Sequence, residues 1–399
     1  MTSRTNGGPR AHALAALATA LGAATAGATA GAVDCNTLPS PVYGIGGSAQ
    51  KPLLARLGAR MAALAAPRTL IYQAPGACLG VNAIVTPTAR LTGQASYWSA
   101  AGMELTCDLP VAGVPADYAS VGTQATLCPG VAALPTDVGD FEGPVSTWNF
   151  FVPTASTQQS ISTEAAYFVY GFGRNSGVAP WMDEAAIIRR DANSAAQIVV
   201  SLETSVPAER FLGVDAMTNG RSISLVAMAT NAQAAIGFAS GENVDANRAT
   251  VRTLAFQHTG QTCGYWPDST ATAFDKRGVR DGLYWLWTTT HFLARVDGSR
   301  AIVNPIVRDF VGWFTGAVEP PTGVNVLDLT IQNGNIPRCA MRVTRTRDLG
   351  PLASYAPPAP CGCYFEQRAT GSTTCTACTA SATCPAGAPV CRNGFCEVN

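Results

Sequence analysis

Short apolar runs alternate with amphipathic stretches along most of this chain. Four runs have the length and the apolar or β-branched character of buried strands: 42–45, 68–73 (RTLIYQ), 146–153 (STWNFFVP) and 234–240 (AAIGFAS). Each is bounded by Gly, Pro, Ser or Asn, the residues that favour turns. We therefore expect several short strands separated by turns and helices.

Three stretches between these runs predict helices. Apolar side chains recur every three or four positions from Pro52, an acceptable first-turn residue, to Leu64. The segment 162–173 predicts a second, short helix with an acid in its first turn, and 304–316 predicts an amphipathic helix that ends at Gly316. Strand, turn and helix follow one another to about residue 350, which is typical of an α/β sheet.

The composition changes at residue 354. The segment 354–399 holds seven cysteines with many Pro, Gly and Thr residues and few large aliphatic side chains. Such a segment cannot build a core from apolar side chains alone, so we expect cross-links to hold it. We treat 354–399 as a cysteine-rich C-terminal region.

The first 32 residues have the three-part layout of a secretory signal. Arg4 and Arg10 precede an Ala/Leu stretch, and Ala30 and Ala32 are the small residues of a cleavage site. The alternative is a disordered tail, because the stretch is only weakly apolar. We predict a signal peptide at 1–32 and export to the periplasm or the cell surface.

The cysteines and the charges agree with export. All 13 cysteines lie after residue 32, which suits an oxidising compartment, and an odd number leaves at least one thiol over. The chain has 26 basic and 26 acidic side chains, and removing residues 1–32 leaves 24 against 26. Nucleic-acid binding needs a clear basic excess, so we expect no nucleic-acid partner.

The pairing of the cysteines stays open at this stage. Cys107 and Cys128 flank a short loop, and Cys263 and Cys339 could join distant strands. The Cys375-x-x-Cys378 motif could be part of a zinc site, but disulfides are the better explanation in an exported protein. We predict no metal and no cofactor.

Three small-residue turns stand between strand and helix patterns: Gly46-Gly47-Ser48, Gly76-Ala77-Cys78 and Asn193-Ser194-Ala195. In open α/β sheets, helix N-termini and unpaired backbone amides converge at such turns and attract anions. Arg190 lies just before the third turn and adds a positive charge. Together these features predict a cleft for a small anion.

The arginines at 189 and 190 also have a purely structural explanation. They could form ion pairs with acids close in sequence, which are Asp183, Glu184 and Asp191. The aromatic segment 261–287 likewise could line a cleft, although it more often forms a folded loop over buried rings.

Six stretches occur in an order that resembles the phosphate-binding subunits of bacterial phosphate ABC transporters, the PstS-like periplasmic binding proteins. They are VYGIGGSAQKPLL, LIYQAPGACLGVNAI, ADYASVGTQATLCPG, FVPTASTQQSISTEAAYFVYGFG, IIRRDANSAAQ and FVGWFTG. The similarity covers roughly residues 40–350 and is to a divergent, cysteine-containing branch.

The resemblance implies a type II periplasmic binding protein fold: two α/β lobes, each a mixed sheet flanked by helices, with the ligand between them. It places the first part of lobe 1 at 36–142, lobe 2 at 143–285 and the second part of lobe 1 at 286–353. It also implies a monomeric receptor for a small oxyanion, most simply phosphate, that serves an ABC importer permease.

The resemblance also implies ligand-binding residues in three loops. By position these are Gly47, Ser48 and Ala49, then Gly76, Ala77 and Cys78, then Arg190, Asn193, Ser194 and Ala195. The chain departs from the family pattern at four positions: Ala192 and Gly122 stand where the family has aspartates, and Ala195 and Ala196 stand where it has a glycine and a threonine. These departures predict a weakened phosphate site or a different ligand.

Two other function classes remain. A structural or adhesive envelope protein would keep the two lobes with a degenerate cleft and dock to a partner through its cysteine-rich region. A hydrolase needs a nucleophile beside a base or a metal cluster. His258 and His291 are the histidines after the predicted signal, and neither lies in such a pattern in the sequence. We therefore expect a binding protein and not an enzyme.

Overall fold

The computed structural model describes residues 33–398, so the predicted signal peptide at 1–32 lies outside the described residues. Its main feature is a ten-stranded mixed sheet. Nine of the strands follow the order β1-β5-β4-β3-β2-β6-β14-β7-β11, and β12 also pairs with β7. The strands are β1 (Val33–Asp34), β2 (Pro41–Gly46), β3 (Thr69–Gln73), β4 (Gln94–Trp98), β5 (Glu104–Asp108), β6 (Tyr118–Val121), β7 (Val138–Pro153), β11 (Gly237–Ser240), β12 (Val251–Thr253) and β14 (Trp287–Arg295).

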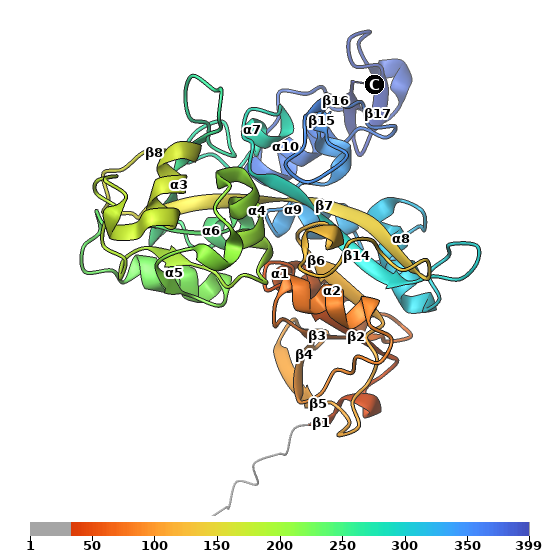
Figure 1. Ribbon diagram of the computed structural model, residues 1–399. Coiled ribbons are helices and arrows are strands. Elements are labelled where there is room, and N and C mark those ends of the chain that lie inside the picture. The colour runs from red at the N-terminus through yellow and green to blue at the C-terminus, as the bar shows by residue number, and fades with distance from the viewer. Residues whose placement is uncertain (1–32, 399) are drawn as a thin grey trace, which may run out of the picture. The chain divides into compact units, whose positions relative to one another are not determined.

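Ten helices accompany this sheet within residues 33–398. They are α1 (Lys51–Ala62), α2 (Ala77–Val85), α3 (Thr163–Phe172), α4 (Ala195–Thr204), α5 (Asn219–Ala227), α6 (Gly241–Asp245), α7 (Arg277–Arg280), α8 (Pro305–Thr315), α9 (Val326–Gln332) and α10 (Gly362–Thr370). Figure 1 shows α1 and α2 beside β2, β3 and β6, and α3 to α6 around the other end of β7. The expected α/β architecture is confirmed.

Outside the main sheet, residues 33–398 also form six short 3-10 helices and four two-stranded sheets. The sheets pair β8 (Ser160–Ser162) with β13 (Ala255–Gln257), β9 (Ile188–Arg189) with β10 (Val214–Asp215), β15 (Val343–Thr344) with β16 (Ala353–Ser354), and β17 (Val390–Arg392) with β18 (Phe395–Glu397).

The pair β7 and β14 joins the two halves of the main sheet. The strands run antiparallel, with Trp287 opposite Thr147 and Arg295 opposite Val138, and the register shifts between Thr289 and His291. Strand β14 also pairs with β6, and β7 with β11, so the sheet is continuous through both segments (Figure 1). Residues 33–399 cluster as one unit, and the predicted lobe boundaries within it stay a prediction.

The predicted helix at 304–316 is confirmed as α8, and its ends follow from the sequence. The Asn304 side chain accepts hydrogen bonds from the N–H groups of Ile306 and Val307, which caps the helix start. Pro305 occupies the first turn, where its missing N–H costs nothing. Gly316 ends the helix with φ 77°, a conformation that glycine adopts without strain.

The aromatic segment 261–287 folds as an irregular stretch around α7, with Tyr284, Leu286 and Trp287 buried. The prediction of a loop over buried rings therefore describes most of the segment. Phe274 is the most exposed ring, at 46%, and Tyr265, Trp266 and Trp285 are partly buried.

Disulfides hold the cysteine-rich region, as expected. Cys363 pairs with Cys375, Cys378 with Cys391, and Cys384 with Cys396. Both cysteines of the C-x-x-C motif are therefore used in disulfides. Around these bonds the region forms α10 and the β17–β18 hairpin.

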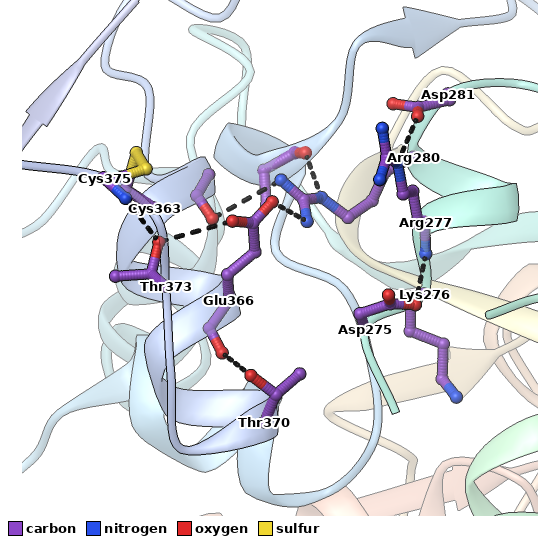
Figure 2. A network of polar contacts seen from close by, with 12 residues as sticks. Asp275, Lys276, Arg277, Arg280, Asp281, Cys363, Glu366, Thr370, Thr373 and Cys375 are labelled. Atoms are coloured by element: carbon purple, nitrogen blue, oxygen red, sulfur yellow. Dashed lines mark hydrogen bonds and ion pairs between the residues drawn. A yellow bond between two sulfur atoms is a disulfide. The ribbon is translucent and has the colours of Figure 1, made fainter. Parts of the chain in front are cut away.

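A buried arginine connects this region to the rest of the chain. Arg280 of α7 donates from Nη1 to Glu366 of α10 at 3.0 Å and from Nε to the Ala340 carbonyl at 2.9 Å. Figure 2 shows this guanidinium pointing at the Glu366 carboxylate, with Cys363–Cys375 beyond it. On the other side of α10, Tyr364 and Arg368 bind Asp328 of α9.

The two pairings suggested for the remaining cysteines are wrong. Cys107 bonds to Cys35, because β1 lies beside β5 in parallel register and brings the two Cα atoms to 5.0 Å. Cys128 bonds to Cys78 at the start of α2.

Cys339 bonds to Cys361 instead of Cys263. Cys263 is exposed and is the free cysteine among the described residues, in line with the odd number of cysteines. In residues 33–398, no helix combines the length and the apolar character that crossing a membrane requires.

Candidate oxyanion site

The N-terminal ends of four helices meet around one small cavity. The starts of α1 and α2 contribute Ser48 and Ala77, while α4 and α5 contribute Ser194 and Asn219. The cavity is very small: its volume for the centre of a water-sized sphere is about 10 Å³, which is room for about one water molecule. This is far below the roughly 300–1,000 Å³ of a site for a drug-sized molecule. Its lining residues are Gly47, Ser48, Ala49, Gln50, Gly76, Ala77, Trp148, Arg190, Ser194, Ala195, Ala196 and Asn219.

Backbone amides at these helix starts are unpaired. Within the described part of the chain, no hydrogen bond uses the N–H of Ala49, Ala77, Ala195 or Ala196, all of which line the cavity. The first N–H groups of a helix lack partners within the helix, and the helix dipole adds partial positive charge there. The cavity is therefore lined by donors suited to an anion.

Close approach of the loops depends on glycine at two positions. Gly46 has φ 154°, and a Cβ on it would lie 2.0 Å from the Ser120 carbonyl oxygen. Gly76 has φ 151° and packs against Asn193, which belongs to the loop before α4. Any side chain at these positions would strain the backbone or push the loops apart.

Arg190 brings a buried positive charge to the cavity. It is 4% exposed, and none of the ion pairs among residues 33–398 includes it. Its Nη1 donates to Asn219 Oδ1 at 2.5 Å and its Nη2 to the Met217 carbonyl at 2.8 Å, while Nε has no partner. A buried cation without a carboxylate is costly, so this arrangement favours an anion beside it.

Burial lowers the pKa of Arg190 to about 10, although the nearby carboxylates of Asp191 and Asp215 oppose the shift. The guanidinium therefore stays protonated at neutral pH. Asp191 accepts from the Asn193 N–H, and Asp215 binds Arg189 at 3.0 Å. Neither aspartate lines the cavity.

The suggested ion pairs of Arg189 and Arg190 with Asp183, Glu184 or Asp191 are wrong. Arg189 pairs with Asp215, which is distant in sequence and lies on β10 beside β9. Arg190 pairs with no acid among the described residues. The acids close in sequence are used elsewhere, since Glu184 accepts from the Arg174 N–H and Asp183 from the Ala185 N–H.

Gln50 is the polar side chain that the sequence did not single out. It is 3% exposed, and neither its Oε1 nor its Nε2 has a hydrogen-bond partner within residues 33–398. It precedes α1 without capping it. A Cβ on Gly122 would lie 2.8 Å from Gln50 Nε2 and 2.7 Å from Trp148 Cζ2. Gln50 and Trp148 thus fill the space beside the position where the resemblance implies an acid.

Two hydroxyls from different parts of the chain complete the site. Ser194 is buried and precedes α4 without using its side chain as a cap. Ser48 accepts from Asn219 Nδ2 at 3.4 Å, which connects the loop before α1 to the start of α5.

Two of the ten predicted site residues, Cys78 and Asn193, do not line the cavity. The Cys78 sulfur is bonded to Cys128, and its N–H donates to the Asn193 carbonyl at 3.1 Å. This hydrogen bond joins the first turn of α2 to the loop before α4. The remaining eight predicted residues do line it: Gly47, Ser48, Ala49, Gly76, Ala77, Arg190, Ser194 and Ala195.

Sequence reasoning missed Gln50, Trp148, Ala196 and Asn219. Gln50 directly follows the predicted first loop, so extending that loop by one residue would have included it. Asn219 follows Thr218, whose side chain caps α5, and a Thr-Asn-Gly run before a helix is a usable signal. Trp148 sits in an apolar strand, where the sequence does not reveal which face it occupies.

The fold brings acids to both histidines of the described chain. His258 Nδ1 lies 2.6 Å from Glu203, and the ring stacks on Trp285. His291 lies between Asp140, at 2.8 Å from Nδ1, and Thr289, at 3.2 Å from Nε2.

The acid, imidazole and hydroxyl around His291 have the order found in a hydrolase triad. Burial opposes the charged ring, but hydrogen bonds and charges from Asp140 and Asp348 raise the pKa of His291 to about 9. A ring that is already protonated cannot take a proton from Thr289 at neutral pH. These three residues therefore do not provide the base that the hydrolase hypothesis requires.

A second, larger cavity lies beside α1, α6, α9 and α10 and is lined in part by Glu242 and Lys276. Lys276 is paired with Asp245 and Asp268, and burial raises the pKa of Glu242 to about 7. This cavity contains none of the predicted site residues.

Solved structures share this architecture. A protein described as a phosphate ABC transporter substrate-binding protein, from Clostridium perfringens and with phosphate bound, is 10% identical and superimposes with a TM-score of 0.50. The match covers 75% of this chain and 99% of that one. The chain has the fold of a periplasmic phosphate-binding protein.

Two further structures match over similar lengths. An ABC-type phosphate transport receptor from Vibrio cholerae is 15% identical, covers 74% of this chain and 99% of its own, and has a TM-score of 0.46. A high-affinity periplasmic phosphate-binding protein bound with phosphate is 14% identical, with 74% and 90% covered and a TM-score of 0.46. No family model and no curated protein sequence matches the chain. The match to the Clostridium perfringens structure shows the type II fold that the sequence predicted and leaves the ligand to be argued from the site.

Proposed function

We propose that this protein is an exported solute-binding protein that holds a small inorganic oxyanion, with phosphate as the first ligand to test. One observation carries the proposal. A buried guanidinium without a carboxylate partner, that of Arg190, faces a small cavity at the meeting point of four helix N-termini. An oxyanion would satisfy the charge, the free Nε and the unpaired amides at once.

The size of the cavity restricts the ligand class. A cavity of about 10 Å³, with room for about one water molecule, is too small for a nucleotide or an oligosaccharide, and it takes a tetrahedral oxyanion only when the lining loops move slightly apart. Phosphate is supported by the solved structures that share the fold and contain it. Delivery to the permease of an ABC importer, as a monomeric receptor, is the role that fits such a protein.

The proposal is tested by a thermal-shift screen of the purified chain without residues 1–32. Phosphate, sulfate, arsenate, molybdate and small carboxylates are each added over a range of concentrations. A ligand at 100 times its Kd stabilises the folded state by about 2.7 kcal/mol, which appears as a concentration-dependent rise in Tm. We expect a rise with tetrahedral oxyanions and none with the carboxylates.

No rise with any anion up to millimolar concentration would contradict the proposal. It would leave the structural or adhesive role that the cysteine-rich region predicts. That alternative is not favoured by the contacts seen, because Arg280 and Asp328 attach α10 to the chain's own body.

A further inference from the structure

We propose that the site does not select for a protonated oxyanion and accepts fully deprotonated dianions of the sulfate class as readily as phosphate. This inference rests on the proposed function, because it specifies the ligand class of the same cavity. It follows from which side chains line the cavity and from the position of the neutral Gln50 amide among them.

The lining contains no group that repels a bare anionic oxygen. Of its twelve residues, Arg190 is the one with an ionisable side chain, and it is cationic. The other polar side chains, Ser48, Gln50, Ser194 and Asn219, are neutral. Asp191 and Asp215 lie close enough to affect Arg190, yet they are bound to Asn193 and Arg189 outside the cavity.

Discrimination between phosphate and sulfate requires a proton acceptor that also carries negative charge. Phosphate keeps at least one proton near neutral pH, whereas sulfate keeps none. A carboxylate accepts a hydrogen bond from the protonated ligand and repels the unprotonated one, so it favours phosphate. A neutral amide can donate to one oxygen or accept from a P–OH group, and it repels neither ligand.

Gln50 occupies the position where such a carboxylate could act. Both of its polar atoms are buried and unpartnered within residues 33–398, and they lie between Gly47 and Gly122. The contacts with Gly122 and Trp148 leave no room for a side chain at residue 122. On the side of the cavity near Gly122, the side-chain amide of Gln50 is therefore the polar group that is available to form a hydrogen bond with the ligand.

The test is isothermal titration calorimetry of the purified protein with sodium sulfate and with sodium phosphate. For the wild type we expect the two Kd values to agree within ~10-fold. We also expect the sulfate Kd to stay constant between pH ~6 and ~8, because none of the lining groups titrates in that interval.

The decisive variant is Gln50→Glu, which adds a carboxylate with almost no change of shape. We expect its sulfate affinity to fall at least ~30-fold at pH ~8 and to recover at lower pH, while phosphate affinity changes less than ~10-fold. Gln50→Met is the neutral control. It should weaken both anions and leave their ratio unchanged, and thermal unfolding of each variant verifies that it folds.

The outcomes separate this inference from the proposed function. Phosphate binding by the wild type with sulfate more than ~10-fold weaker overturns the inference and leaves the proposed oxyanion receptor unaffected. A sulfate-to-phosphate ratio in Gln50→Glu equal to that of the wild type also overturns it. Binding of neither anion contradicts the proposed function itself.

Discussion

Two adjacent arginines with the same chemistry serve different purposes here. Arg189 ends β9 and forms an ion pair with Asp215, whereas Arg190 turns into the cavity and pairs with no acid within residues 33–398. In a strand, successive side chains point to opposite sides, which separates the two. The sequence indicated that an arginine next to a helix start could hold an anion. Because β9 ends at Arg189, Arg190 is the one of the two that lines the cavity.

This difference gives a matched pair of variants. Arg190→Met removes the charge and should weaken oxyanion binding by about 1.5–3 kcal/mol, or ~10- to 150-fold in Kd. Arg189→Met removes the neighbouring charge from a partly exposed ion pair that does not line the cavity and should change Kd less than ~3-fold. Calorimetry with the tightest ligand of the screen measures both. Equal losses in the two variants would mean that only the net positive charge of this region matters.

A second residue-scale prediction concerns His291, which lies in β14 between β6 and β7. Burial opposes its charged form, but Asp140 and Asp348 raise its pKa to about 9, above the ordinary value of about 6.5. The charged ring therefore stabilises the fold fully below pH ~6.5, and this contribution disappears as pH rises through ~9. The difference between the two pKa values corresponds to at most about 3 kcal/mol.

We expect His291→Gln to lower the free energy of unfolding by about 2–3 kcal/mol at pH ~6. The gap between variant and wild type should close towards pH ~10. Urea denaturation of both proteins at the two pH values measures the gap, and titrations common to both proteins cancel in the comparison. A gap that widens with pH would show that the neutral ring is the stabilising form.

At the scale of elements, the sequence predicted helices and strands best where local residues define both ends of the element. The helix at 304–316 and the strand at 146–153 were predicted from periodicity and flanking residues, although β7 proved longer at its start. Disulfide connectivity could not be predicted in this way. It depends on which elements become neighbours, as when β1 joins the sheet edge beside β5 and directs Cys35 to Cys107.

The contact between α7 and α10 provides the element-scale prediction. Arg280 is buried and its ion pair with Glu366 is only partly exposed, so Glu366→Gln leaves a buried charge less well compensated (Figure 2). We expect a loss of about 1–3 kcal/mol in unfolding free energy. Arg277→Gln is the control, because its ion pair with Asp281 is exposed and should contribute less than about 0.5 kcal/mol.

Both variants are compared by denaturation without reductant, so that the disulfides stay intact. Equal and small losses would mean that the disulfides alone hold α10 in place. A larger loss for Arg277→Gln than for Glu366→Gln would contradict the assignment of Arg280 as the anchor.

At the scale of the whole molecule, the candidate site depends on segments that are far apart in the chain and come together around one cavity. The loop before α1 touches α5 through Ser48 and Asn219, and the first turn of α2 binds the loop before α4 through Cys78 and Asn193. The order of motifs predicted this convergence, because turns at the ends of parallel strands share one edge of a sheet. It could not predict Gln50, whose side chain packs into the space that Gly122 leaves because it has no side chain.

The most direct measurement is a crystal structure of the protein with selenate, located by the anomalous signal of selenium. We predict one strong anomalous peak in the cavity. The selenate oxygens should lie within hydrogen-bond distance of Arg190 Nε, the Gln50 amide and the N–H groups of Ala77 and Ala195. An empty cavity at a selenate concentration that saturates binding in solution, or an ordered anion only elsewhere, would contradict it.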